Sequence, residues 1–462
     1  MTGNRAAATR HARSRRAVLG GVALAALPLA AACGAGPGSA QEAPAAARRK
    51  SGEKISLRHA PWPGAPSRAA QTAVVEAWNK SHPEVQMVEE LLPGEGSHYQ
   101  KLGVQAAADT LPDLTFMQGS NDYVSFAARN LLLPIEGLIK KDRGFDQKVR
   151  LHPRSREIVD LLGHTWGLPV EAGTYVVFYN RAAFEEAGVP VPQKGWTWQD
   201  LLDRARRLTR DVGGKQRFGY GQGGGFDRVE PWIVQNGARI LDKVAFPEKQ
   251  LLDSPDVAAA VQFLHDLAWK HRVMATSATG GPTAYAQGRG LWEGDQAMRQ
   301  EGVWLAPDLA KNMKTPWGMA PLPKGKKDAT WMSIDVNVAF KATKHPEDAY
   351  EFLKFVNDEG QTPMIELWGR MPVTLKEEHK QTFVRYLKSV GVDNWEVAWD
   401  AWDAGYSSHL SPAWPDLERD AVKPAMDRLF GAEGGAANVA TVLKEVAPTA
   451  QQALNQKGAA PR

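Results

Sequence analysis

The sequence predicts an α/β protein that contains more than one domain. Its 462 residues exceed what a single hydrophobic core usually organises, so two or three domains are expected. A composition of 43% hydrophobic and 23% charged residues is typical of a soluble globular fold. Strand-like and helix-like segments also alternate along the first part of the body, which favours a parallel sheet covered by helices.

This alternation begins at residue 54. Residues 54–57 alternate between polar and apolar side chains and run into a Pro-Gly turn, which indicates a strand. Residues 68–80 carry apolar side chains at helical spacing, and Pro83 ends that helix. The next three segments predict a strand, a helix and a strand, in the order 84–92, 98–110 and 112–117.

Residues 1–32 predict an export signal that is cleaved. Five arginines precede an apolar run of small residues and leucine, and no acidic residue occurs before Glu42. The run is too short and too rich in alanine for a membrane-spanning helix. Cys33 ends this run and is the only cysteine of the chain, so no intrachain disulfide is expected.

The segment around Cys33 resembles a bacterial lipoprotein signal, in which such a cysteine receives diacylglycerol and becomes the new N-terminus. The match is imperfect, because Ala30 stands where that family has leucine. The resemblance implies a lipid anchor on the cell membrane, with plain cleavage as the alternative. Residues 14–19 also resemble a twin-arginine export signal, the other route being Sec export. Residues 33–53 lack aromatic and β-branched side chains and predict a lipidated cysteine followed by a flexible tether.

The charge of the exported part argues against a nucleic-acid partner. Five of the 56 basic residues and none of the 52 acidic residues precede Cys33, which leaves 51 basic and 52 acidic residues. A nucleic-acid-binding domain would need a basic face. The body of the chain is instead nearly neutral.

Several segments of the body occur in the order and spacing of one known family. The most specific block joins residues 167–169 to Tyr179, Asn180 and a helix at residues 184–188. Further matching segments follow, at residues 288–305, 317–325, 345–358 and 413–431. The chain resembles the extracellular solute-binding proteins of family 1, the sugar-binding lipoproteins of ABC importers, to which the maltose-binding protein belongs.

The resemblance implies a periplasmic-binding-protein-like fold, with two α/β lobes joined by a hinge around a ligand cleft. Lobe 1 would comprise residues 54–168 and 323–369, and lobe 2 residues 169–322 and 370–462. Pro169, Gly173 and Pro321 are expected to interrupt strands where the chain changes lobes. Ligand contacts from both lobes would then favour the closed form and signal occupancy to a transporter.

Tryptophans supply the flat surfaces that a sugar site needs, because C–H faces of sugars lie on aromatic rings. Four of them stand where the family contacts ligand or beside a flexible glycine stretch, namely Trp62, Trp232, Trp304 and Trp414. The resemblance implies ring stacking for Trp304 and Trp414, while packing in a core or turn is the alternative for all four. Trp395, Trp399 and Trp402 recur at helical spacing and are assigned to the core.

Polar side chains would supply the directed hydrogen bonds that sugar hydroxyls require. The candidates are Asn121, Asp122, Glu171, Asp335 and Arg370. In the family, the loop of Asn121 and Asp122 faces the cleft, and an acidic hydroxyl acceptor stands at Glu171, where a solvated carboxylate is the alternative. Asp335 departs from the family pattern and lies in an apolar strand, where it needs a partner. Arg370 is expected to pair with Asp335, to donate to hydroxyls, or to lie at the surface.

The resemblance thus implies a monomeric, lipid-anchored binding protein that delivers a carbohydrate, preferably an oligosaccharide, to an ABC importer permease. A secreted carbohydrate-active enzyme and a binding protein for a non-sugar solute are the alternatives. The sequence contains no G-x-S-x-G, H-E-x-x-H or Walker motif. We therefore expect no catalytic residue, no metal ligand and no cofactor.

Overall fold

The computed structural model describes residues 52–92, 94, 97–119, 122–284, 288–407 and 409–458. Residues 46–462 form one compact unit. The predicted leader, Cys33 and the tether as far as residue 51 lie outside the described residues. In the part of the chain that is described, no helix has the length and apolar character needed to cross a bilayer.

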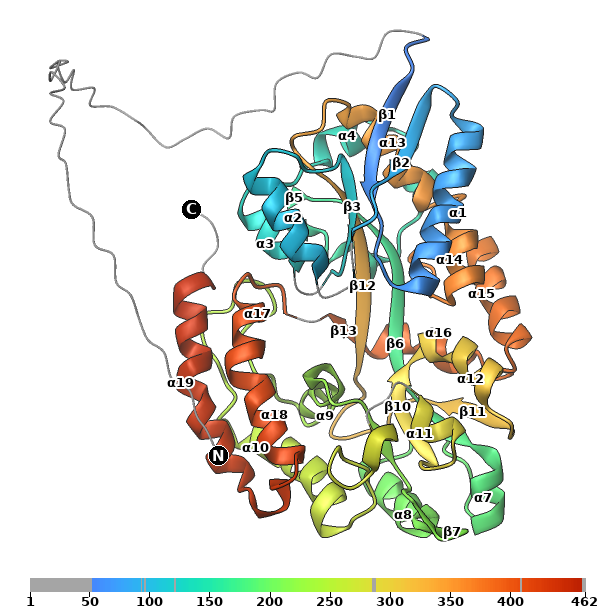
Figure 1. The fold of residues 1–462 in the computed structure, drawn as a ribbon, viewed down its shortest axis with the longest axis vertical. Helices are drawn as coiled ribbons and strands as arrows, with labels where there is room; N and C mark the ends of the chain where they lie inside the picture. Colours follow the sequence, from blue (N-terminus) through green and yellow to red (C-terminus); the bar gives the residue numbers. More distant parts are fainter. Residues whose placement is uncertain are drawn as a thin grey trace, which may run out of the picture. The chain divides into compact units, whose positions relative to one another are not determined.

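A mixed sheet organises the described residues (Figure 1). Its strands follow the order β2-β1-β3-β12-β6-β10-β9, with β11 paired to β6 and β13 paired to β12. These strands are β1 (Ile55–Ala60), β2 (Val85–Glu89), β3 (Leu114–Met117), β6 (Leu168–Asn180), β9 (Gly221–Gln222), β10 (Met298–Gly302), β11 (Trp317–Ala320), β12 (Thr330–Ala339) and β13 (Gly405–Ser407). β1 is parallel to β2 and β3, whereas β12 runs antiparallel to both β3 and β6.

The predicted alternation at the start of the body is confirmed. The expected strands correspond to β1, β2 and β3, and the expected helices to α1 (Ala65–Ser81) and α2 (His98–Ala107). Pro66 lies in the first turn of α1, where backbone amides have no partner within the helix. Proline is favoured there because it has no amide hydrogen and its φ is already close to the helical value. The helix ends at Ser81, two residues before Pro83, because proline cannot continue the backbone hydrogen bonds.

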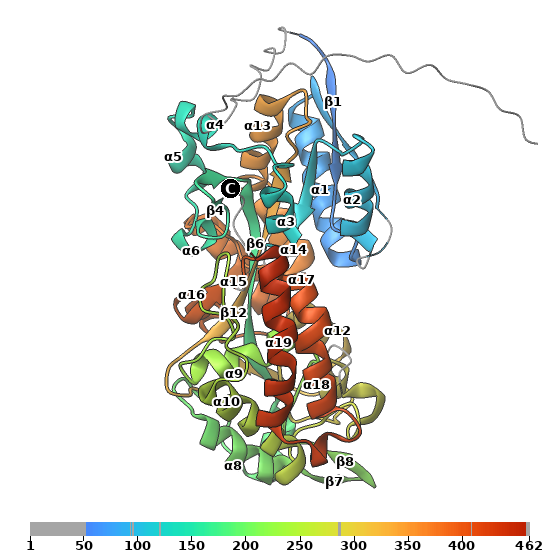
Figure 2. The same ribbon diagram turned by 90° about the vertical axis from the view of Figure 1, so that its left-hand side faces the viewer.

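The remaining helices cover the sheet and connect its strands (Figures 1 and 2). Those between β3 and β9 are α3 (Asp122–Ala128), α4 (Glu136–Lys141), α5 (Phe145–Val149), α6 (Pro153–Arg156), α7 (Arg181–Ala187) and α8 (Trp198–Leu208). Those between β9 and β12 are η2 (Phe226–Arg228), α9 (Glu230–Gln235), α10 (Pro255–His265), η3 (Asp266–Lys270), η4 (Gly281–Thr283), α11 (Arg289–Trp292), η5 (Val303–Leu305) and α12 (Ala306–Asn312).

Further helices follow β12. They are α13 (Pro346–Val356), α14 (Gln361–Trp368), α15 (Glu377–Ser389), α16 (Glu396–Ala404), α17 (Trp414–Leu417), η6 (Glu418–Val422), α18 (Lys423–Phe430), η7 (Gly434–Ala436) and α19 (Val439–Lys457). Two short hairpins complete the described structure, β4 (Asp160–Leu161) with β5 (His164–Thr165) and β7 (Arg210–Val212) with β8 (Lys215–Arg217). α19 packs against α10, α17 and α18.

β6 is one continuous strand of 13 residues and links two parts of the sheet. Its residues up to Thr174 pair with β12, and those from Tyr175 onward pair with β10, with β11 joining from Val177. The prediction that Pro169 and Gly173 interrupt strands is wrong, because both lie inside β6. The register shifts between Asp335 and Val336, opposite Pro169, and such a β-bulge accommodates a residue that cannot donate a ladder hydrogen bond. Pro321 directly follows β11, as expected for a strand end.

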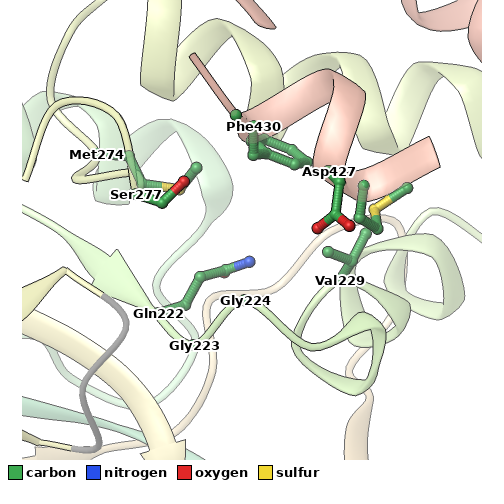
Figure 3. A pocket seen from close by; sticks show the side chains of 10 residues that line it. Gln222, Gly223, Gly224, Val229, Met274, Ser277, Asp427 and Phe430 are labelled. Carbon is green, nitrogen blue, oxygen red and sulfur yellow. The ribbon is translucent and has the colours of Figure 1, made fainter. Parts of the chain in front are cut away.

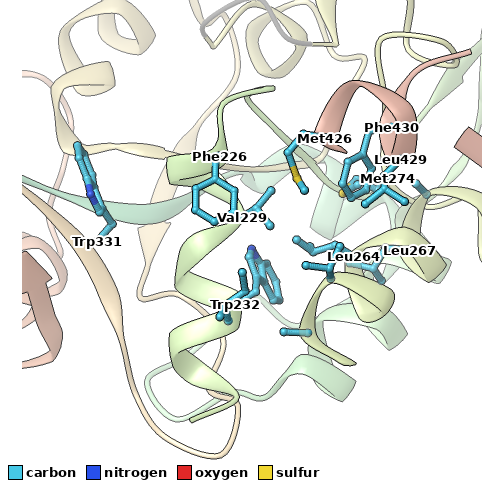
Figure 4. Close-up of a cluster of buried hydrophobic side chains, with 14 of the residues drawn as sticks. Phe226, Val229, Trp232, Leu264, Leu267, Met274, Trp331, Met426, Leu429 and Phe430 are labelled. Atoms are coloured by element: carbon cyan, nitrogen blue, oxygen red, sulfur yellow. The ribbon is translucent and has the colours of Figure 1, made fainter. Parts of the chain in front are cut away.

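Separate hydrophobic clusters pack around the two parts of β6. One cluster joins β1, β2 and β3 to α1 and α13 through side chains such as Leu57, Trp78 and Phe352. Another surrounds Trp232 and includes Leu264 and Phe430 (Figure 4). Trp402 is buried and Trp395 and Trp399 pack partly buried beside it, so the assignment of this stripe to the core is confirmed. The exact boundaries of the two lobes stay a prediction.

Candidate ligand-binding site

Three of the predicted polar residues meet where β6 and β12 pair. Glu171 on β6 lies directly opposite Asp335 on β12. Arg370 follows α14 and the left-handed Gly369, and its guanidinium binds Glu171, with Nη2 at 2.5 Å from Oε1. The same Nη2 lies 3.6 Å from Oδ2 of Asp335. We call these three residues the first charged cluster.

The first charged cluster is buried, with 1% of Glu171, 4% of Asp335 and 6% of Arg370 exposed. Like charges directly opposite each other destabilise a sheet, and Arg370 offsets that repulsion. Burial nevertheless raises the pKa of Glu171 well above its usual value. Arg370 lowers this pKa and Asp335 raises it, and burial has the largest effect. Asp335 Oδ1 also accepts hydrogen bonds from the Ser333 hydroxyl at 3.4 Å and the Gly119 amide at 3.3 Å. The carboxyl groups are therefore fixed in orientation by partners from several elements.

Two indole rings flank the guanidinium of Arg370. Its Cζ atom lies 4.6 Å from the centre of the Trp304 ring and 4.8 Å from that of Trp368. Trp304 belongs to η5, which follows β10, and it remains partly exposed. The guanidinium thus lies over the Trp304 ring in a cation–π contact.

Glycines allow the indole of Trp304 to lie directly on the sheet. A Cβ atom on Gly173 would lie 2.6 Å from Cε3 of Trp304, and one on Gly302 would lie 2.2 Å from Cζ2. Both distances are far below van der Waals contact. The ring also packs against Tyr175, with 5.7 Å between ring centres, and against the edge of Trp331.

A second charged cluster lies next to Trp304 and consists of Tyr175, Asp227, Arg228 and Glu301. The Tyr175 hydroxyl donates to Asp227, and Arg228 binds both Asp227 and Glu301, with 2.7 Å between Nη2 and Glu301 Oε1. The Arg228 guanidinium lies 5.2 Å from the centre of the Tyr175 ring. Burial alone would raise the pKa of Glu301, but Arg228 and Arg299 lower it below its usual value. This cluster therefore holds Glu301 as a carboxylate.

Polar and aromatic side chains continue from the second charged cluster toward α17. The hydroxyl of Tyr406 on β13 is buried and has no hydrogen-bond partner among the described residues. Nearby, His409 Nε2 lies 2.8 Å from Glu230 Oε1, and the His409 ring lies 4.2 Å from that of Trp414. The unpartnered hydroxyl is the kind of group that a ligand hydroxyl satisfies.

The structure brings together four of the nine predicted site residues. Arg370 contacts Glu171, Asp335 and Trp304, so the expected ion pair of Arg370 with Asp335 is present. Because Arg370 is buried, its alternative as a surface residue is wrong.

Three of the other predicted residues, Trp62, Trp232 and Trp414, pack against partners outside this group. Trp62 is buried against His98, Tyr99 and Phe116. Trp232 is 1% exposed, and its Nε1 donates to Gln300 at 3.1 Å, so its rings have no free surface. Trp414 is 5% exposed and packs against Phe226 as well as His409. Asn121 and the side chain of Asp122 lie outside the described residues. Ligand contact by these five residues stays a prediction.

Sequence reasoning missed the residues that complete the site. Tyr175, Asp227, Arg228, Glu301, Trp331, Trp368 and Tyr406 were not singled out. A signal existed for Tyr175, since side chains two apart on a strand share a face and Glu171, Gly173 and Tyr175 follow that rule. Trp331, Ser333 and Asp335 obey it on β12.

One group of possible metal ligands occurs among the described residues, formed by Asp358, Glu378 and His379. The ammonium of Lys376 binds Asp358 and lies 3.5 Å from Glu378 Oε1. His379 Nδ1 is 2.6 Å from the Thr374 hydroxyl. The ammonium of Lys376 thus already occupies the two carboxylates that a metal cation would need as ligands.

Comparison with known proteins gives the family. Residues 63–363 match the family model described as bacterial extracellular solute-binding protein. The arabinooligosaccharide-binding protein of Halalkalibacterium halodurans is 23% identical over 295 residues, which are 61% of this chain and 62% of that protein. The chain therefore spans less than two thirds of that relative. The arabinooligosaccharide-binding protein of Bacillus subtilis is 25% identical over 67% of this chain and 73% of its own length.

A solved structure confirms the fold class. An ABC substrate-binding protein from Listeria monocytogenes, in complex with cycloalternan, superposes with a TM-score of 0.75 at 19% identity. The superposition covers 87% of this chain and 99% of that one. The predicted α/β fold and the family resemblance are both confirmed by these matches. The chain belongs to the bacterial extracellular solute-binding proteins, a family whose place of action is outside the cytoplasm.

Proposed function

We propose that the protein captures a carbohydrate, specifically an oligosaccharide, between two lobes and delivers it to the membrane permease of an ABC importer. The observation that carries this proposal is the partly exposed Trp304 ring beside buried carboxylates and a guanidinium, at the strand pair that links two hydrophobic cores. Relatives named for arabinooligosaccharides and a structurally similar protein bound to cycloalternan support the same ligand class.

The chemistry of the site suits sugar hydroxyls. A hydroxyl both donates and accepts, so a set that mixes carboxylates, guanidinium groups and a tyrosine hydroxyl offers it partners of each kind. The unpartnered hydroxyl of Tyr406 and the partly exposed ring of Trp304 provide one polar and one apolar contact. Glu171, Asp335 and Arg370 bind mainly each other, so we assign them to positioning Trp304 and to few direct ligand contacts.

The remaining predictions belong to this proposal. Asn121 and Asp122 would face the cleft, and Trp62, Trp232 and Trp414 would contact the ligand only after movement of their surroundings. The exported chain would be a monomer that is anchored through a lipid on Cys33, with the twin-arginine route as one export path.

Calorimetry of the exported body tests the proposal. Arabino-, gluco- and cyclic oligosaccharides should bind with heat release, and a saturating ligand at 100 times its Kd should stabilise the fold by about 2.7 kcal/mol. Trp304→Ala should weaken binding about tenfold or more, which is about 1.4 kcal/mol. Trp399→Ala removes a partly buried indole that lies under Lys380 outside the site, and it should leave affinity within about twofold.

Two outcomes would overturn the proposal. If chromatography showed that the protein converts the oligosaccharides into shorter products, this result would favour the carbohydrate-active enzyme. Stabilisation by amino acids, polyamines or metal chelates, with none by any saccharide, would favour a non-sugar ligand.

A further inference from the structure

A cavity of about 270 Å³ lies beside the second charged cluster (Figure 3). Four segments line it: the glycine stretch at Gln222 and Gly223, the loop at Met274, the residue after η2, and the end of α18 at Asp427 and Phe430. None of the residues that were predicted from the sequence lines this cavity.

The volume of the cavity fits a single substituted ring. An engineered protein cavity of roughly 150 Å³ holds benzene, and sites for larger organic ligands begin at roughly 300 Å³. About 270 Å³ therefore accommodates one six-membered ring with its hydroxyl groups, and it excludes a chain of rings.

The lining offers both an apolar surface and hydrogen-bonding groups. Met274, Met426 and Phe430 belong to the hydrophobic cluster around Trp232, so this wall is held by a packed core (Figures 3 and 4). Gln222 is 4% exposed, and its Oε1 accepts from the Tyr220 hydroxyl at 3.0 Å. The same hydroxyl lies 3.0 Å from Gln300 Oε1, and the nitrogen of the Gln222 amide points into the cavity (Figure 3).

A carboxylate lies across the cavity from that amide nitrogen. Asp427 points its oxygens inward, and one of them already binds Lys423 at 2.5 Å (Figure 3). Both side chains of this i,i+4 pair are exposed to solvent, so Asp427 can exchange Lys423 for a ligand donor. An amide donor and a carboxylate acceptor match the donor and acceptor capacity of hydroxyl groups. The cavity therefore favours a polyhydroxylated ring.

The cavity is connected to the proposed sugar site through Gly223. A Cβ atom at Gly223 would lie 2.8 Å from Nε of Arg228, so this backbone is in contact with the second charged cluster. From there, Arg228 lies 5.2 Å from the Tyr175 ring, and Tyr175 lies 5.7 Å from the Trp304 ring. A ligand that reaches both Trp304 and the cavity must contain more than one ring.

We propose that this cavity is a subsite that holds one terminal ring of the bound oligosaccharide and thereby selects for chain length. The proposal rests on the proposed function. The amide of Gln222 and the apolar wall at Phe430 recognise the two sides of that ring.

Calorimetry with an oligosaccharide series of one to six units tests the subsite. Ser277 is exposed on the rim of the cavity, so Ser277→Trp fills the entrance without disturbing the core. It should reduce the affinity of the longer oligosaccharides about tenfold and change that of the shortest binding unit by less than about twofold. Gln222→Leu keeps the side-chain volume and removes the amide donor. It should therefore lower the affinity of the same longer oligosaccharides.

Ala278→Trp is the matched control, because Ala278 is exposed and adjacent but does not line the cavity. It should bind every length like the unmodified protein. Equal affinities of Ser277→Trp and Ala278→Trp for all lengths would overturn the subsite and leave the proposed function intact. An equal loss for all lengths would also overturn it, since the cavity would then not be selective. Absence of any saccharide binding by the unmodified protein would defeat the proposed function itself.

Discussion

Gly173 determines where the partly exposed indole of Trp304 lies. A methyl group at this position would meet the Trp304 ring at 2.6 Å and Nη1 of Arg370 at 3.1 Å. We predict that Gly173→Ala displaces Trp304 and lowers oligosaccharide affinity about tenfold, measured by calorimetry. Gly137→Ala adds the same group on α4, where no atom lies within 4 Å, and should leave affinity unchanged. Equal binding by both variants would contradict this role.

Arg370 is expected to be essential for stability, because its guanidinium is the cation that contacts two buried carboxyl groups. Arg370→Met should lower the free energy of unfolding by about 3–5 kcal/mol, measured in urea without ligand. Adding Glu171→Gln should restore part of that loss, because one of the two opposed carboxyl groups is then removed.

An exposed ion pair provides the control for Arg370→Met. Arg428 binds Glu445 at 2.7 Å with both side chains about half exposed, and Arg428→Met should cost at most about 1 kcal/mol. If Arg370→Met costs no more than Arg428→Met, the buried cluster is not a stability determinant.

Single residues show how far the sequence could predict the site. The demand of a buried carboxylate for a partner made Arg370 a candidate partner of Asp335, beside two alternatives for Arg370, and the structure contains that pair. Glu171 was predicted as an acceptor for ligand, whereas its main partner is Arg370. Asp227, Arg228 and Glu301 were missed, because Asp227 is joined to Tyr175 and Arg228 to Glu301 across long stretches of sequence, and no local pattern records such contacts.

At the level of secondary structure, the first strands and helices followed from periodicity alone. β6 did not, since Pro169 and Gly173 are normally signs of interruption. The bulge where β6 pairs with β12 tolerates the proline, and the indole of Trp304 fills the space that Gly173 leaves open. Both compensations come from other segments, so the length of β6 was not predictable from its own residues.

The packing of β1 against α2 makes stability depend on pH. His59 on β1 and His98 at the start of α2 are buried, and burial lowers the pKa of each to about 4. Their neutral forms are favoured in the folded state, so the unfolded chain binds more protons below pH 6.5. The free energy of unfolding is therefore unaffected by these histidines above that pH. It falls as the pH decreases toward 4, by on the order of 3 kcal/mol per histidine.

Urea unfolding at pH values between 7.5 and 4 measures this effect. His98→Gln removes one of the two titrating groups and should flatten the pH dependence, whereas His345→Gln, at a half-exposed position before α13, should not. A steep loss of stability that is unchanged in His98→Gln would show that other groups cause it.

For the whole molecule, the order of matching segments was the strongest signal. No single segment decided the family, but the fold class and the family both followed from their sequence and spacing, and both are confirmed. The position of the 270 Å³ cavity could not be predicted from the order of these segments. It depends on how the glycine stretch, the Met274 loop and α18 meet, which only three-dimensional packing determines.

The continuity of β6 and β12 limits how this protein can be cut or rebuilt. A chain truncated after Pro321 would keep β3 and β6 but lose β12, the strand between them, and expose two unpaired edges that invite aggregation. Neither half can therefore be produced as an uninterrupted fragment. A reporter domain for sensing the ligand is better inserted in the Gly213–Gly214 turn of the β7–β8 hairpin, where both glycines face open space.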